Sequence, residues 1–226
     1  MENLADENEK ALLDKVGKAA QRVKLFPLPM VALFPHQGVP LHVFEPRYRK
    51  LAQDALSSDG VVALPQTRPH QGPGHVPEVS RVFGVGIIAE HEQLHEGRYN
   101  IVVRGIARAR LVQEIASDNL YREAEIEILD EDASGVTADD TSALSACLLE
   151  LSRAATQDTQ SVLRKLSLLG NNPGRLADLT AAVMLNPGLH QSVMAELNVK
   201  KRLTWVTEQI ALMLLSSKSP SDMTMN

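Results

Sequence analysis

This sequence has little cysteine, few aromatic residues, no long apolar run and no excess of basic charge. Its single cysteine, Cys147, excludes an internal disulfide and a metal cluster held by thiolates. Its eight aromatic residues are few for stacking bases along a nucleic-acid strand. No stretch approaches the roughly 18 consecutive apolar residues that a membrane-spanning helix needs. The acidic N-terminus also lacks the apolar region of a secretory signal. We therefore expect a cytoplasmic protein without a membrane partner.

The charge of the chain is slightly negative and is unevenly distributed. The net charge is −5 overall, with −2 in residues 1–21, −3 in residues 22–132 and zero in residues 133–226. Because binding to nucleic acid draws on phosphate neutralisation by basic residues, we expect no nucleic-acid partner. The hydrophobic fraction of 44% and the charged fraction of 23% are ordinary for a globular protein. A chain of 226 residues allows one large domain or two small ones.

The first half of the chain is rich in proline and in strand-forming residues. Four prolines in residues 24–44 forbid a helix and favour short edge strands at about 24–26, 30–33 and 40–43. Glu45 and Pro46 predict a helix start, and a buried stripe follows at helical spacing: Tyr48, Leu51, Ala52, Ala55 and Leu56. Residues 61–64 form a short apolar strand. Residues 65–80 contain four prolines and two glycines, which predicts a long exposed loop.

Residues 81–129 alternate between apolar and polar side chains, as an antiparallel sheet does. We expect strands at 82–89, 99–103 and 106–112, with a turn at Glu96 and Gly97, and a further strand after residue 121. Arg108 and Arg110 share one face of their strand and would oppose the alternating glutamates at 123, 125 and 127. We interpret this ladder as a solvated sheet face.

The second half of the chain changes to a helical period. Residues 130–142 contain no isoleucine, leucine or aromatic residue and are the best linker candidate. Two similar starts, Asn172-Pro173-Gly174 and Asn186-Pro187-Gly188, each predict a capped helix with proline at its first position. We therefore expect an α+β protein with a helical arm at 1–21, a β-rich domain at 22–132, a helical subdomain at 133–216 and a flexible tail at 217–226.

One short motif suggests metal chemistry, but its context does not. Residues 91–95, HEQLH, match the zinc hydrolase pattern H-E-x-x-H, which needs a helix to present both histidines to one ion. Here strand patterns lie on both sides of the motif, which favours a polar hairpin connection. A zinc hydrolase using His91, Glu92 and His95 stays as an alternative. No phosphate-binding P-loop is present. The run from Gly84 to Ala89 resembles the dinucleotide fingerprint G-x-G-x-x-A, but the apolar pattern continues and no helix follows, so we expect no cofactor.

Three stretches together resemble the N-terminal, substrate-binding domain of Lon proteases. They are LFPLPMVALFPHQGVPLHVFEPRYRKLAQDAL, VFGVGIIAEHEQLHEGRYNIVVRGIARARL and LADLTAAVMLNPGLHQSVMAELNVKKRLTWV, and they cover roughly residues 24–215. The resemblance implies a PUA-like β-barrel followed by an all-helical bundle. It also implies recognition of polypeptides, which Lon proteases hand to an ATPase. We expect this chain to lack the Lon ATPase and peptidase modules.

These inferences give a non-catalytic polypeptide-binding module, acting as an adaptor or weak chaperone. The expected partners are unfolded or extended polypeptides and, in addition, a protease or another protein. Phe44, Glu45, Arg47 and Tyr48, in the stretch LHVFEPRYR, are the candidate binding residues. The competing interpretation is that these residues define the fold, with Tyr48 packed in the core. RNA binding is a further alternative, since PUA-like barrels elsewhere bind RNA, but the charge of −3 on residues 22–132 opposes it.

Overall fold

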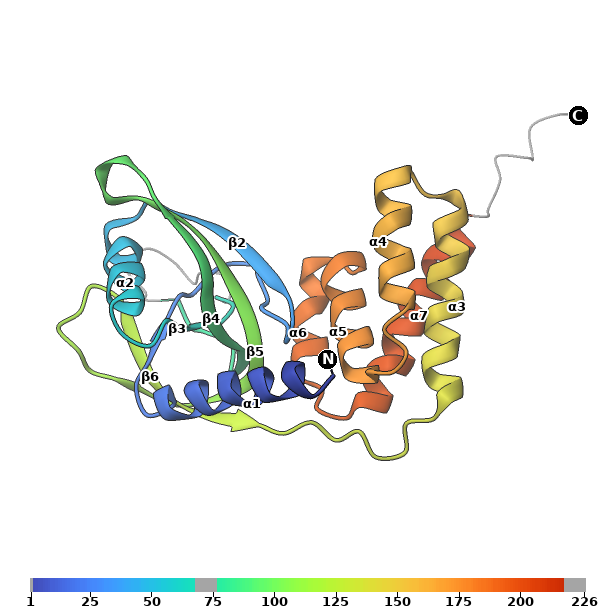
Figure 1. Ribbon diagram of the computed structural model, residues 1–226, viewed down its shortest axis with the longest axis horizontal. Helices are drawn as coiled ribbons and strands as arrows, with labels where there is room; N and C mark the ends of the chain where they lie inside the picture. The colour runs from blue at the N-terminus through green and yellow to red at the C-terminus, as the bar shows by residue number, and fades with distance from the viewer. Residues whose placement is uncertain (1, 68–76, 218–226) are drawn as a thin grey trace, which may run out of the picture. The chain divides into compact units, whose positions relative to one another are not determined.

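The computed structural model describes residues 2–67 and 77–217, and these residues form two units (Figure 1). The first unit is Met1–Asp130 with Pro187–Ala195, and the second is Glu131–Asn186 with Glu196–Asn226. The central part of the predicted loop and nearly all of the predicted tail lie outside the described residues. Within the described part, no helix combines the length and the hydropathy needed to cross a bilayer.

The first unit is a six-stranded mixed sheet that closes on itself. Its strands are β1 (Val23–Leu25), β2 (Gly38–Val43), β3 (Val61–Leu64), β4 (Val82–Gln93), β5 (Tyr99–Ile115) and β6 (Arg122–Leu129). Their order is β2-β5-β4-β3-β1-β6, and the long strand β5 also pairs with β6. Only β1 and β3 pair in parallel among these described strands. The pairing of β5 with β6 closes a barrel, while β2 remains an edge strand. The predicted α+β class is confirmed.

Glycines inside the strands let another part of the backbone come close. A Cβ on Gly105 would clash with the carbonyl oxygen of Phe34, and one on Gly84 would clash with that of Leu33. β5 therefore runs through Gly105, where the sequence predicted a break between two strands. The predicted strand at 30–33 is wrong, because this segment is a loop laid against β4 and β5. Within it, Met30 has a φ of 56°, which extended structure does not allow.

Helices α1 (Glu2–Ala19) and α2 (Pro46–Leu56) complete the core of the first unit (Figure 1). α1 buries Val16 and Ala19 against a cluster that includes Val23, Leu25 and Phe83. The N-terminal arm is thus part of the barrel core. α2 begins where Pro46 predicted it, and it buries the expected stripe of Tyr48, Leu51, Ala52 and Ala55. β3 is buried on both faces, since its alternate residues belong to two different clusters.

Helix α6 (Pro187–Ala195) packs on the barrel, although its helical period placed it with the helical subdomain. The Gln191 side chain donates a hydrogen bond to the carbonyl oxygen of Val82 at 2.9 Å. Arg108 Nε donates to the carbonyl oxygen of Met194 at 3.1 Å. Arg108 is therefore buried, and its assignment to a solvated face is wrong. Arg110 does follow that prediction, since it forms an exposed ion pair with Glu127 at 2.7 Å.

The second unit is a bundle of four helices: α3 (Ala138–Ala154), α4 (Gln157–Ser167), α5 (Pro173–Met184) and α7 (Val199–Ser217). The predicted cap at Asn172 is in place. The Asn172 side chain accepts a hydrogen bond from the Arg175 amide, and that of Asn198 accepts one from Lys201, both at 3.0 Å. α3 has a reciprocal cap between Thr137 and Asp140. Leucines line the bundle core: Leu144, Leu148, Leu163, Leu166, Leu176 and Leu203.

A buried arginine holds the bundle to its own connecting segments. Arg202 of α7 has a side chain with no exposed surface, and it lies 2.8 Å from a Glu131 carboxylate oxygen and 3.2 Å from one of Asp178. It also donates to the carbonyl oxygen of Glu196 at 2.9 Å. Gly174 makes room for this group, because a Cβ there would come 2.8 Å from the Glu131 carboxylate. The chain passes into the second unit at Glu131 and again at Glu196. Arg202 therefore holds the chain at both of these points.

Candidate functional site

A groove of about 270 Å³ opens on the first unit beside the start of α2. One side of its lining is apolar and comes from the segments after β1, before β4 and before β6: Pro27, Leu28, Pro29, Pro77 and Leu120. Three of the four predicted binding residues, Glu45, Arg47 and Tyr48, line the other wall. The fourth, Phe44, does not line this groove.

Tyr48 stands at the centre of a layered stack. Its ring lies parallel to that of Phe26, with centroids 4.1 Å apart and planes 12° apart. Its hydroxyl donates to the carbonyl oxygen of Pro27 at 3.1 Å, and burial raises the pKa of this phenol. The Arg47 guanidinium covers the other side of the ring at 4.5 Å from its centroid. Tyr48 is therefore both a core residue, as the competing interpretation held, and a fixed part of the groove wall.

Arg47 is held in this position by its neighbour Glu45. Glu45 is the N-cap residue of α2, but its side chain does not cap the helix. Its carboxylate instead accepts hydrogen bonds from Arg47, with Nε at 2.9 Å and Nη2 at 2.8 Å. The Arg47 side chain keeps 54% of its surface exposed. A planar cation thus lies at the rim of the groove with its orientation already set.

Tyr121 and Arg122, at the start of β6, form the opposite wall, and the sequence patterns did not predict them. The Tyr121 hydroxyl donates to Asp54 at 2.9 Å. Burial and the Asp54 carboxylate raise the pKa of Tyr121 well above its ordinary value. Although burial opposes ionisation of Asp54, hydrogen bonds from Lys50 and Tyr121 lower the pKa of its carboxyl group. Arg122 donates to the carbonyl oxygen of Pro77 at 3.0 Å and pairs with Glu114.

Three exposed hydrophobic residues either line this groove or are adjacent in sequence to its lining residues. Met30, Phe44 and Leu120 are 62%, 60% and 66% exposed. Leu120 lines the groove, Met30 follows the lining residue Pro29, and Phe44 precedes the lining residue Glu45. A concentration of exposed apolar surface around a concave site is typical of an interaction surface. A sequence signal for the missed wall did exist, because Leu120 and Tyr121 are the only large apolar residues in the polar turn at 116–123.

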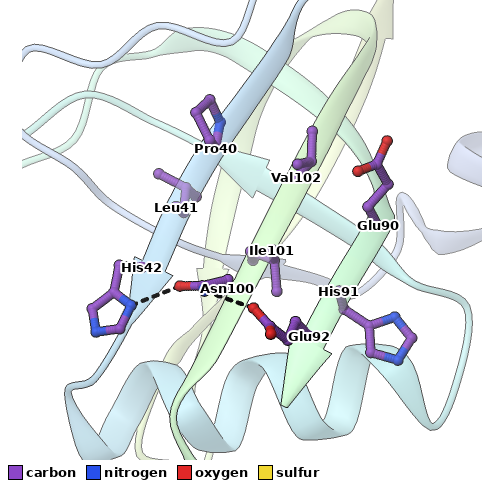
Figure 2. Close-up of a pocket in the computed structure, with 9 residues that line it drawn as sticks. All are labelled: Pro40, Leu41, His42, Glu90, His91, Glu92, Asn100, Ile101 and Val102. Atoms are coloured by element: carbon purple, nitrogen blue, oxygen red, sulfur yellow. Dashed lines mark hydrogen bonds between the residues drawn. The ribbon is translucent and has the colours of Figure 1, made fainter. Parts of the chain in front are cut away.

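The H-E-x-x-H motif lies on a strand and a short turn. β4 continues to Gln93, and a single 3-10 turn follows at His95–Gly97, so His91 and His95 do not share a helix face. Glu92 accepts a hydrogen bond from the Asn100 side chain at 2.9 Å (Figure 2). Within residues 2–67 and 77–217, no group of three metal-ligating side chains of His, Cys, Asp or Glu could hold an ion. The hairpin connection predicted from the flanking strands is what the structure has.

Comparison with known proteins gives the family. The model of the ATP-dependent protease La (LON) substrate-binding domain matches residues 22–211. The Lon protease of Roseiflexus castenholzii is 31% identical over 188 residues, which are 80% of this chain and 23% of that protein. The Lon protease of Heliobacterium modesticaldum is 25% identical over 205 residues, which are 88% of this chain and 25% of that protein. The chain thus spans about a quarter of the length of these relatives.

Solved structures show the same fold. The N-terminal domain of Mycobacterium avium complex Lon protease superposes with a TM-score of 0.64 at 16% identity, covering 84% of this chain and 98% of that one. The Lon N-terminal domain protein from Xanthomonas campestris gives a TM-score of 0.59 at 20% identity, covering 88% and 99%. The resemblance inferred from the three sequence stretches is confirmed, and the chain belongs to the family of the ATP-dependent protease La (LON) substrate-binding domain.

Proposed function

We propose that this protein binds unfolded or extended polypeptide segments in the groove formed by Glu45, Arg47 and Tyr48 with Leu120 and Tyr121. The observation that carries the proposal is a largely apolar groove, with the exposed Leu120 in its lining, on a chain of a substrate-binding family. A folded protein keeps most of its large apolar side chains inside, whereas an unfolded chain offers them. The groove therefore binds unfolded polypeptides in preference to folded ones.

The dimensions and chemistry of the groove suit one side chain of an extended segment together with its backbone. A volume of about 270 Å³ is slightly below the roughly 300 Å³ at which small-molecule pockets begin. Tyr48 and Tyr121 are anchored by hydrogen bonds to Pro27 and Asp54, so they lose little conformational freedom when a ligand packs on them. The Arg47 guanidinium provides donors for backbone carbonyl groups of the bound segment. A small contact of this kind gives weak and reversible binding, as a chaperone or adaptor needs.

The test is the fluorescence anisotropy of a labelled, permanently unfolded polypeptide titrated with the protein. We expect a stable rise that unlabelled unfolded chain competes away, and that the folded form of the same chain and RNA do not. Leu120→Ser should weaken the binding several-fold, because it removes apolar surface from the groove. Burial of apolar surface contributes about 25 cal/mol of binding free energy per Å². The matched control is Val112→Ser, since Val112 is 53% exposed on β5 outside the groove.

The outcomes separate the proposal from its competitors. A flat titration, or an equal loss in both variants, would contradict the groove as the binding site. A slow fall of the anisotropy below its starting value would mean that the probe is being cut, which favours a hydrolase. The adaptor role has its own measurement, the rate at which a Lon-type protease degrades the same unfolded chain with and without this protein. An adaptor accelerates that degradation, and a holding chaperone slows it.

A further inference from the structure

A second hollow lies on the outer face of the sheet, where β2, β5 and β4 run side by side (Figure 2). The strand register places Pro40, Val102 and Glu90 in one outward row and His42, Asn100 and Glu92 in the next. The hollow measures about 500 Å³, and all of its lining residues belong to these three strands. It is a preformed, shallow surface of three strands.

The floor of this hollow is fixed by a hydrogen-bonded row across all three strands. Nδ1 of His42 lies 2.8 Å from Oδ1 of Asn100, and Nδ2 of Asn100 donates to Oε2 of Glu92 at 2.9 Å (Figure 2). Because the Asn100 oxygen only accepts, His42 donates to it. Both functions of the Asn100 amide are used within the protein. Glu92 receives one hydrogen bond and keeps further acceptor capacity on its two oxygens.

The charge of the hollow is negative and uncompensated. Its lining contains the carboxylates of Glu90 and Glu92 and no lysine or arginine among the described residues. Within the same part of the chain, neither glutamate forms an ion pair, although other carboxylates of the sheet do, such as Glu114 and Glu127. Arg104, the next outward residue of β5, lies beyond the lining. An occupant carrying positive charge would therefore complement this face.

The hollow is continuous along the chain with the groove described above. Phe44, which is 60% exposed, stacks on His42 with centroids 6.0 Å apart and precedes Glu45 of the groove. Glu45 lies three positions after His42 in the sequence, which corresponds to about 10 Å of extended chain. An extended segment of five or six residues can thus reach from one site to the other across the ring of Phe44.

We propose that this sheet face binds a positively charged, extended polypeptide segment, with lysine or arginine side chains paired to Glu90 and Glu92 and apolar atoms against Val102 and Phe44. The inference rests on the proposed function and deepens it, because it gives the bound polypeptide a preferred charge. The segment lies on the face of the sheet and does not extend its edge. Pro40 of β2 lacks the N–H group that an added strand would require.

The experiment compares two capped peptides of the same apolar sequence, one with lysine and one with glutamine at alternate positions. Anisotropy gives the affinity of each for the wild type, for Glu90→Gln/Glu92→Gln and for Glu7→Gln/Glu208→Gln. The last variant changes the net charge equally, at exposed helix positions that do not line the hollow. We expect the lysine peptide to bind the wild type and the control about fivefold more tightly than the glutamine peptide, as two exposed ion pairs allow. The preference should vanish in Glu90→Gln/Glu92→Gln and at high salt.

Each outcome decides the inference. Equal affinity of both peptides for the wild type overturns it. In that case the proposed function still stands if Leu120→Ser weakens the binding of the peptides. A lysine preference that survives in Glu90→Gln/Glu92→Gln also overturns it, because the net charge of −5 would then be the cause. Absence of any peptide binding contradicts both proposals. The side-chain amide resonances of Asn100 give the location independently, since they should shift with the lysine peptide in wild-type protein.

Discussion

Replacement of Arg202 by methionine should destabilise the helical unit more than any other exchange of a single charge in it. The Arg202 side chain is fully buried, and it lies between the Glu131 and Asp178 carboxylates, of which Asp178 is itself 1% exposed. Removing one partner of a buried ion pair costs about 3–5 kcal/mol, because the remaining charge stays desolvated. The lost hydrogen bond to the carbonyl oxygen of Glu196 adds about 1 kcal/mol. We therefore expect a loss of about 4–6 kcal/mol.

The assay is urea unfolding followed by tryptophan fluorescence. Trp205 is the single tryptophan of the sequence and lies three residues after Arg202 in α7, so it reports on this unit. With a denaturant slope of about 2 kcal/mol per molar, the midpoint should fall by about 2–3 M. Arg153→Met is the matched control, because Arg153 pairs with Glu150 but is 78% exposed. The control should change the stability by less than about 1 kcal/mol.

Two results would contradict this expectation. If Arg202→Met unfolds at the same midpoint as Arg153→Met, the buried carboxylates do not depend on Arg202. If Arg202→Met/Asp178→Leu is less stable than Arg202→Met alone, the loss does not come from an uncompensated charge. We expect the double variant to recover part of the stability, since it removes the buried charge that the single variant leaves behind.

Two further predictions concern the first unit. Gly105→Ala should destabilise it by about 1–3 kcal/mol or more in urea unfolding, because the added Cβ meets the backbone of Phe34. The control is Gly17→Ala in α1, whose Cβ meets nothing within 4 Å and should stabilise the unit by about 0.5–1 kcal/mol. Equal effects of both variants would contradict the close approach of the Phe34 backbone to Gly105. In a spectrophotometric titration, the pKa of Tyr121 should lie above the ordinary tyrosine value of 10.0, and Asp54→Asn should move that pKa downwards. The raised folded-state pKa of Tyr121 contributes stability that is complete below about pH 10 and declines as the pH rises above it. The lowered pKa of Asp54 contributes stability above about pH 4, and this stability is lost as the pH falls through the folded-state value. A Tyr121 pKa unchanged by Asp54→Asn would contradict their hydrogen bond.

Local signals predicted much of the fold because their physical causes are local. Pro46 fixes the first turn of α2, and Asn172 with Pro173 fixes the start of α5. The alternation in β4 to β6 also belongs to the residues themselves. The loop at 30–33 could not be predicted in this way, because its path is set by distant glycines. Gly84 and Gly105 accommodate the Leu33 and Phe34 carbonyl groups, and nothing in the sequence of the loop announces that contact.

The candidate site was predicted only as far as one short stretch reaches. Glu45, Arg47 and Tyr48 are neighbours in sequence, and the helix start brings them to the same wall. The opposite wall depends on the pairing of β1 with β6, which carries Tyr121 to the vicinity of Pro27. Phe44 does not line the groove, and the reason again lies in a strand. It directly follows β2, and the continued alternation turns it outwards toward His42.

The placement of α6 shows that a helical period does not tell which unit a helix joins. Arginine in a sequence indicates a surface, yet Arg108 and Arg202 are the two largest fully buried side chains of the described residues. Each binds a backbone carbonyl group at the end of α6, Arg108 that of Met194 and Arg202 that of Glu196. Carbonyl groups at a helix end have no partner within their helix and carry partial negative charge. The backbone is thus bound on both sides of Ala195, by Arg108 in the first unit and by Arg202 in the second. Helix α6 resembles its neighbouring helices in sequence, yet it is held to the barrel by contacts that cannot be predicted from its helical period.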